Sequence, residues 1–161
     1  MIVGGVVVVL LVGGVINRWM GKTAAEKVIE AATGGKAQVN TDNGEVTVKT
    51  DQGTYSTSDK IPSDFPSDVP VYSGAKVQSS VATSQQQGSG HYLALETTDS
   101  LDKVSAWYKS QVVDKGWKIE SDATIQGTLI LGATKDTRQL SVSVSDDGNG
   151  KVAIILVVAT K

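Results

Sequence analysis

Few side chains in this 161-residue chain could perform chemistry. It has no cysteine, which excludes thiol catalysis, cysteine metal sites and disulfides. Its one histidine, His91, belongs to the residue type that ordinarily changes charge between pH 5 and 8. His91 stands beside a glycine-containing loop and has no serine partner in a known nucleophile motif, so we interpret it as a structural or surface residue. The carboxylates are scattered through predicted turns, and none can be paired at a catalytic separation. We therefore predict no enzyme activity, no metal and no cofactor.

Three further patterns could bind ligands. The pattern T-D-x-G occurs at 41–44 and again at 50–53, but the ligand spacing of a calcium loop is missing, which favours simple turns. Trp107 and Trp117 could form an aromatic platform for a sugar, although packing at the rim of a core is the favoured interpretation. The Gln-, Ser- and Gly-rich segment 84–90 could contact a partner, but it is more typical of a hairpin loop.

The N-terminal residues carry the strongest signal of location. Residues 2–16 read IVGGVVVVLLVGGVI and contain no charge. As a helix, residues 1–20 would extend about 30 Å, roughly the thickness of a hydrocarbon core. Arg18 would then reach outward and Trp19 would lie among the headgroups. We predict an interfacial anchor of Arg18, Trp19 and Lys22, and a membrane or assembly helix formed by Val6, Val7, Val8, Val9, Leu10, Leu11 and Val12.

Three interpretations of this apolar segment stay open: a membrane anchor, the core helix of a filament, and a cleaved signal peptide. A signal peptide normally has a basic region before its apolar run, and no basic residue precedes this one. The expected partners are membrane lipid or copies of the chain itself in a homo-oligomer. The net charge of -2 supplies no basic excess for nucleic acid, which is excluded as a partner.

The elements that follow are predicted from turn residues and hydrophobic periodicity. Residues 23–32 favour a continuation of the N-terminal helix, which ends at Thr33-Gly34-Gly35. Asn43-Gly44 indicates a hairpin within a small meander, whose strands are expected near 37–41, 45–49 and 53–57. All three prolines fall in residues 61–70, which predicts a stiff, extended connector. Ile61, Phe65 and Val69 are available to attach this connector to the following residues.

Beyond residue 71 the pattern predicts a sheet with one packed helix. Thr98-Asp99-Ser100 begins a helix over about 100–115, with a buried face of Leu101, Val104, Tyr108 and Val112. Residues 151–159 are apolar enough for a central strand. The other strands are expected near 75–83, 91–97, 117–121, 125–133 and 138–145.

The predicted fold class is α+β. It combines a long N-terminal hydrophobic helix, a small β-meander and an antiparallel sheet with one packed helix in the order ββαββββ. The predicted domains are an N-terminal helix over 1–35, a meander over 36–60, the connector over 61–70 and a head over 71–161.

Residues 61–160 resemble an uncharacterised family of exported bacterial proteins that are membrane-anchored or lipid-anchored. The motifs that carry the resemblance are DVPVYSGA from Asp68, TTDS from Thr97, Trp107-Tyr108 and Gly116-Trp117. The resemblance implies an extracytoplasmic domain and transfers no site residues. A long helix before a β-rich head also resembles type IV pilins, although Gly5 replaces their early acidic residue and no leader peptide is recognisable.

Together these features favour a non-catalytic, surface-displayed protein, anchored by an N-terminal transmembrane helix, whose head binds or scaffolds an unknown ligand. The alternative is a structural subunit of a pilin-like extracellular filament, with the hydrophobic helices forming the polymer core. The cations Arg18, Lys22 and Lys27 would keep the head in the cytoplasm under the positive-inside rule. The resemblance instead favours an extracytoplasmic head, at the cell membrane or in a filament, and this is the expected location.

Overall fold

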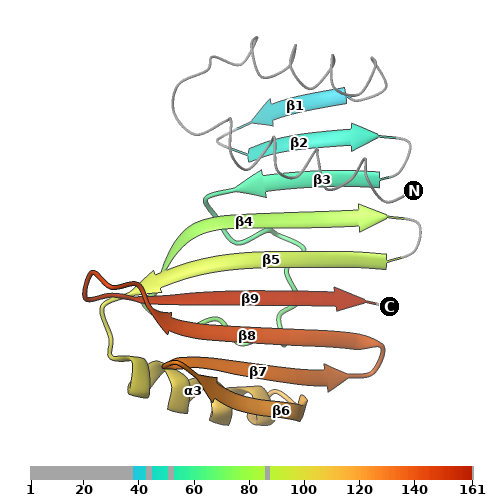
Figure 1. Cartoon of the computed structure of the whole chain (residues 1–161). Helices are drawn as coiled ribbons and strands as arrows, with labels where there is room; N and C mark the ends of the chain where they lie inside the picture. Colours follow the sequence, from blue (N-terminus) through green and yellow to red (C-terminus); the bar gives the residue numbers. More distant parts are fainter. Residues whose placement is uncertain (1–37, 43–44, 51–52, 86–87, 161) are drawn as a thin grey trace.

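A single antiparallel sheet of nine strands organises the molecule (Figure 1). The computed structural model describes residues 38–42, 45–50, 53–85 and 88–160. The strand order across the sheet is β1-β2-β3-β4-β5-β9-β8-β7-β6. The strands are β1 (Gln38–Asp42), β2 (Glu45–Thr50), β3 (Gly53–Ser58), β4 (Lys76–Gln85), β5 (Gly88–Thr97), β6 (Lys118–Ile125), β7 (Thr128–Lys135), β8 (Arg138–Asp146) and β9 (Val152–Thr160).

The order of strands follows from one helical crossover. Each of β1, β2, β3 and β4 pairs with the next strand along the chain. Helix α3 (Leu101–Asp114) then carries the chain to the far edge, and β6, β7, β8 and β9 return toward β5. β9 pairs with both β5 and β8, which suits its apolar sequence VAIILVVAT. The predicted central position of residues 151–159 is confirmed.

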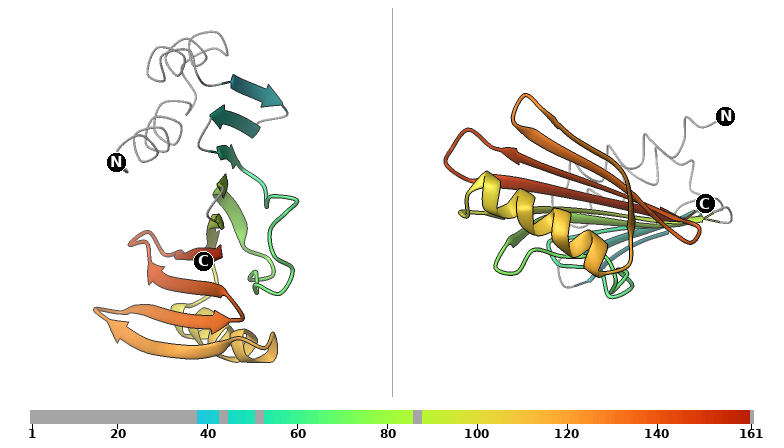
Figure 2. Two further views of the ribbon diagram at one scale, coloured as in Figure 1. Left: turned by 90° about the vertical axis from the view of Figure 1, so that its right-hand side faces the viewer. Right: turned by 90° about the horizontal axis from the view of Figure 1, so that it is seen from below.

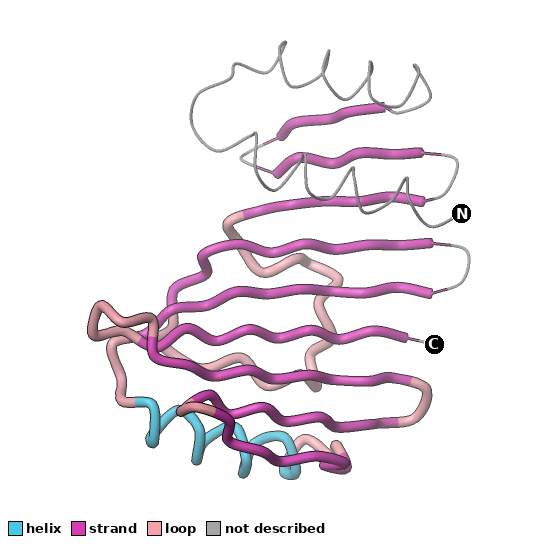
Figure 3. Tube along the Cα trace, viewed as in Figure 1, coloured by secondary structure: helices cyan, strands magenta, loops and turns pink. Residues whose placement is uncertain are grey.

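Helix α3 lies against one face of the sheet, at the end formed by β6, β7 and β8 (Figures 2 and 3). Its first turn is capped by Ser100, whose hydroxyl accepts a hydrogen bond from the Lys103 amide at 3.4 Å. Gly116 ends the helix at a φ of 80°, a conformation that glycine adopts without strain. The helix buries Val104, Tyr108 and Val112 completely, as the sequence pattern predicts. Leu101, the fourth residue of the predicted buried face, is only partly buried against the core.

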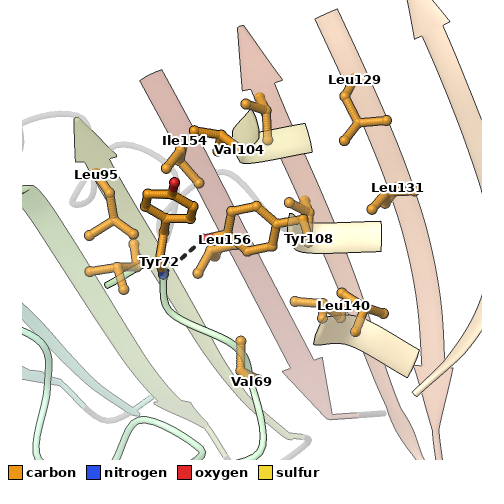
Figure 4. Close-up of a cluster of buried hydrophobic side chains, with 14 of the residues drawn as sticks. Val69, Tyr72, Leu95, Val104, Tyr108, Leu129, Leu131, Leu140, Ile154 and Leu156 are labelled. Atoms are coloured by element: carbon orange, nitrogen blue, oxygen red, sulfur yellow. Dashed lines mark hydrogen bonds between the residues drawn. The ribbon is translucent and has the colours of Figure 1, made fainter. Parts of the chain in front are cut away.

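The main core lies between α3 and the sheet (Figure 4). Alternate residues of the central strands face it, because neighbouring side chains of a strand point to opposite faces. Tyr108 lies at its centre with its side chain fully buried. The sheet contributes Leu93 and Leu95 from β5, Leu129 and Leu131 from β7, Leu140, Val142 and Val144 from β8, and Val152, Ile154, Leu156 and Val158 from β9.

The segment between β3 and β4 also packs on this face of the sheet (green in Figure 1). From here on, the name connector refers to the whole segment between β3 and β4, residues 59–75, which includes the predicted connector over 61–70. The part that the sequence predicts to be extended folds into two successive turns, in which the Phe65 amide donates to the Pro62 carbonyl at 3.0 Å and the Val69 amide to the Pro66 carbonyl at 3.1 Å. The sequence Pro-Ser-Asp-x occurs twice here, at 62–65 and 66–69, and each copy forms one turn. Val69, at the end of the second turn, enters the main core.

The predicted fold class is wrong. The meander is no separate unit, because β3 pairs with β4 from Gly53↔Gln85 to Ser58↔Ser80 and so extends the same sheet. The described residues form a mostly β structure with the single helix α3. Sequence periodicity reports local elements and therefore could not show that β3 belongs to the same sheet as β4. These two strands pair although the whole connector separates them in the sequence.

The predicted N-terminal helix over 1–35 lies outside the described residues. The same is true of its assembly residues Val6 to Val12 and of its interfacial anchor, Arg18, Trp19 and Lys22. Within the described ranges, no helix is both long and apolar enough to cross a bilayer.

Candidate ligand-binding groove

An open groove lies between the connector and the C-terminal half of α3, with a volume of about 430 Å³. Its helix wall is formed by Trp107, Gln111 and Lys115, the last of which caps the C-terminus of α3. The three residues follow one another at a spacing of four and therefore lie on one side of the helix. Its connector wall is mostly apolar and consists of Ile61, Phe65, Pro66, Ser67, Val69, Pro70 and Val71. The volume falls within the roughly 300–1,000 Å³ that is typical of small-molecule sites.

Trp107 is held in a fixed position by two neighbouring aromatic rings. Its ring meets that of Tyr72 edge to face, with centroids 5.0 Å apart, and that of Tyr108 with centroids 4.9 Å apart. Such edge-to-face pairs are favourable because the positive ring edge meets the negative ring face. Trp107 is only partly buried, so part of its side chain lines the groove.

Asp68 attaches the second turn of the connector to the sheet. Its carboxylate accepts two hydrogen bonds from the Arg138 guanidinium, at 2.8 and 2.7 Å, and a Lys135 ammonium lies 2.8 Å away. The hydrogen bond from Arg138, helped by the one from Lys135, holds the pKa of Asp68 far below its usual range despite partial burial. Asp68 is therefore ionised at any physiological pH.

The Asp68 backbone and Trp117 strengthen this attachment. The Trp117 indole N–H donates to the Asp68 carbonyl at 2.8 Å, and the Arg138 guanidinium lies over the Trp117 ring, 5.0 Å from its centroid. A guanidinium in this position is attracted by the ring quadrupole. This end of the connector is thus held by one ion cluster and one buried tryptophan.

Tyr72 attaches the connector to α3. Its backbone N–H donates to the Tyr108 hydroxyl at 3.3 Å, and its own hydroxyl donates to the Asp99 carboxylate at 2.7 Å. Burial raises the pKa of Tyr72, and the hydrogen bond to Asp99 raises it further. The two walls of the groove are consequently joined through Tyr72 and Tyr108, which fixes the position of the connector relative to α3.

The residues singled out from the sequence lie in different places. His91 is buried under the connector, Trp117 belongs to the core, and Trp107 both packs on the core and lines the groove. Core packing is therefore confirmed for both tryptophans. Positions 43–44 and 51–52 of the T-D-x-G turns lie outside the described residues. Within the described residues, no group of three His, Asp or Glu side chains could hold a metal ion.

Sequence reasoning missed the groove itself. Phe65 and Val69 were predicted to attach the connector, and both pack on the core, whereas Ile61 stays exposed beside the groove. The available signal was the polar and aromatic series Trp107, Gln111 and Lys115 on one side of α3. That series indicates a site only once the position of the connector is known.

Comparison with known proteins adds one partial match. A family described as START domain-like matches residues 77–150, a range that extends from β4 to the turn before β9. This range contains α3 but not the connector wall of the groove. Neither the curated proteins nor the solved structures gave a significant match.

Proposed function

We propose that this protein is a non-catalytic binding protein that holds the apolar part of a small ligand in the groove between the connector and α3. The observation that carries this proposal is a groove of about 430 Å³ with an aromatic and aliphatic lining. Its walls are joined by the hydrogen bond from the Tyr72 amide to the Tyr108 hydroxyl before any ligand arrives. A preformed site spends little free energy on ordering, which favours binding.

The chemistry of the lining supports binding rather than catalysis. The polar side chains of the groove are Ser67, Gln111 and Lys115. A serine nucleophile needs an adjacent general base, and the lining holds neither a histidine nor a carboxylate for Ser67. The match of residues 77–150 to a START domain-like family also supports a binding domain.

The lining also defines the class of ligand. An aromatic or branched aliphatic body fits between Trp107 and the Phe65–Pro66 side of the connector. A polar head group would meet Gln111 and Lys115, and Lys115 takes part in no ion pair within the described part of the chain. We therefore propose a small molecule with an apolar body and one hydrogen-bonding end.

The location of the binding domain is a second part of the proposal. The uncharged residues 2–16 would hold the protein in a membrane, with the groove on the extracytoplasmic side. The resemblance of residues 61–160 to exported, anchored bacterial proteins supports this orientation. The pilin-like filament, in which the same residues pack against copies of themselves, stays the alternative hypothesis.

A groove-filling substitution tests the proposal. The full chain in lipid nanodiscs is titrated with 4-phenylbutyrate in a calorimeter, and empty nanodiscs give the reference heat. Gln111→Trp fills the groove and should weaken binding at least about tenfold, because the ligand and the new ring compete for one space. Ala106→Trp adds the same side chain at an exposed position of α3 outside the lining and should leave binding unchanged. Equal binding by Gln111→Trp and the wild type, or no binding at all, would contradict the proposal.

A further inference from the structure

His91 on β5 has a buried polar atom without a partner. Its side chain is only 8% exposed and lies under the connector, where the Phe65 ring meets it edge to face with centroids 5.6 Å apart. The Nδ1 atom is buried and makes no hydrogen bond. More than nine in ten buried polar groups are hydrogen-bonded, so an unpaired nitrogen at this position calls for an explanation.

The nearest acidic group is Asp64, the residue before Phe65 in the connector. Its Oδ1 atom lies 3.9 Å from His91 Nδ1, which is too long for a hydrogen bond but within reach of an ion pair. A neutral imidazole that carries its proton on Nε2 offers only a lone pair at Nδ1, and a carboxylate offers only lone pairs as well. Protonation converts Nδ1 into a donor, and the two groups then match in both charge and hydrogen bonding.

The other groups around His91 leave Asp64 as its natural partner. On the sheet, His91 is paired with Ala82 of β4 and Val158 of β9, neither of which can ionise. The remaining charged groups of the elements packed on it are Asp59, Lys60 and Asp68 in the connector, Glu96 of β5 and Lys76 of β4, whereas β9 carries none. Asp68 is engaged with Arg138, and Glu96 with Lys151.

Fixed attachments hold the connector on either side of Asp64. On one side, the Ser80 hydroxyl lies 2.7 Å from the Lys60 carbonyl, to which it donates. On the other side, Asp68 is bound by Arg138 and Lys135. The first attachment is a hydrogen bond between uncharged groups, and in the second the Arg138 guanidinium holds the pKa of Asp68 far below its usual range. Residues 62–65 form the turn between these two attachments. In the described structure, the one ion pair of this turn whose charge depends on pH is that between Asp64 and His91.

We propose that His91 and Asp64 form a proton-operated latch on this turn of the connector. Protonation of His91 draws the Asp64 carboxylate onto Nδ1 and presses Phe65 against the sheet, and loss of the proton releases the turn. Since Phe65 also lines the groove, the latch sets the position of one wall. The latch concerns the attachment of the connector and does not depend on the groove binding a ligand.

Hydrogen exchange of two backbone amides tests the latch in the full chain. The Phe65 amide reports the first turn and the Val69 amide the second, through their bonds to Pro62 and Pro66. Protection factors, which correct for the pH dependence of exchange itself, are compared at pH 5.0 and pH 7.5. We expect Phe65 protection to be about threefold to tenfold higher at pH 5.0, and Val69 protection to be equal at both values.

Two variants test whether the pH response of the Phe65 amide comes from the Asp64 carboxylate. Asp64→Asn keeps the shape of the side chain but removes its charge, and should abolish the pH response of Phe65. Asp59→Asn removes an exposed carboxylate earlier in the connector and should preserve that response. The ¹⁵N shift of His91 Nδ1 reports the protonation state of this atom in each sample. A wild-type chain without a pH response at Phe65, or a response that persists in Asp64→Asn, would overturn the latch.

Discussion

Asp68 and Arg138, 70 positions apart in the sequence, form a two-pronged ion pair with N···O distances of 2.8 and 2.7 Å. This pair fixes the connector to β8 and so determines the position of the connector wall of the groove. Both side chains are about a quarter exposed, so water screens the attraction only in part. The pair is the most specific long-range interaction among those that position the proposed site.

Loss of this pair should lower stability in a pH-dependent way. Asp68→Asn should decrease the free energy of unfolding by about 1–3 kcal/mol at pH 7, because Arg138 and Lys135 lose a charged acceptor. The pKa of Asp68 is lowered in the folded state, so its contribution is complete above the ordinary aspartate pKa and is lost as the pH falls. Urea unfolding of the wild type and the variant should therefore give curves that converge below about pH 4. A constant gap down to pH 3 would contradict this account.

The hydrogen bond between Tyr72 and Tyr108 gives a second prediction. Tyr108→Phe removes the acceptor of the buried Tyr72 N–H and should cost about 1–3 kcal/mol of unfolding free energy. Tyr92→Phe makes the same chemical change on a partly exposed strand position and should stay within about 0.5 kcal/mol of the wild type. Equal costs for the two substitutions would show that the bond does not join the connector to α3.

Adjacent residues of β9 test which face of the sheet carries the core. Leu156 is fully buried against α3, and Ile155 is 36% exposed on the opposite face. Leu156→Ala should cost about 2–5 kcal/mol, because it opens a cavity in the core. Ile155→Thr should change stability by less than about 1 kcal/mol. A large cost for Ile155→Thr would indicate that this opposite face is covered in the folded protein, for instance by another copy of the chain.

A charge in the N-terminal apolar segment separates the two locations proposed for the protein. Val9→Asp should remove the full chain from the membrane fraction if residues 2–16 span a bilayer, since a central charge costs about 2.5–3.5 kcal/mol on insertion scales. If the segment instead forms a polymer core, filaments sheared from cell surfaces and seen by electron microscopy should disappear. Gln139→Asp, at an exposed position of β8, should affect neither result. Membrane retention and filaments that both survive Val9→Asp would contradict both locations.

The sequence predicted most local elements well and their long-range arrangement poorly. Among the local elements, the turn between β6 and β7 lies at 126–127, whereas the strands expected at 117–121 and 125–133 placed it at 122–124. The helix expected over 100–115 corresponds to α3 (Leu101–Asp114), because its cap, its apolar face and its terminal glycine are all local signals. The strand expected over 138–145 corresponds to β8 (Arg138–Asp146), where serine and apolar residues alternate. The joining of β3 to β4 was missed, because pairing across a proline-containing connector leaves no periodic pattern in the sequence.

The candidate site depends on such long-range contacts and was not predictable for the same reason. Asp68 appeared only as part of the proline-containing segment 61–70 and as the first residue of the DVPVYSGA motif, and nothing near it indicated a partner on β8. His91 was interpreted as a structural or surface residue and is buried, but its position beside Asp64 requires the fold of the connector. Trp107 was recognised as an aromatic at the core rim, whereas the groove beside it is formed by residues about 40 positions earlier.

The central claim is that a small apolar ligand occupies the groove between the connector and α3. The most direct measurement is a map of ¹H–¹⁵N chemical shifts of the full chain as 4-phenylbutyrate is added. The account predicts concentration-dependent shifts of the Trp107 indole N–H, the Gln111 side-chain amide and the Phe65 backbone amide, with Ile155 and Val157 unchanged on the opposite face of the sheet. Shifts confined to Ile155 and Val157, or no shifts at saturating ligand, would contradict it.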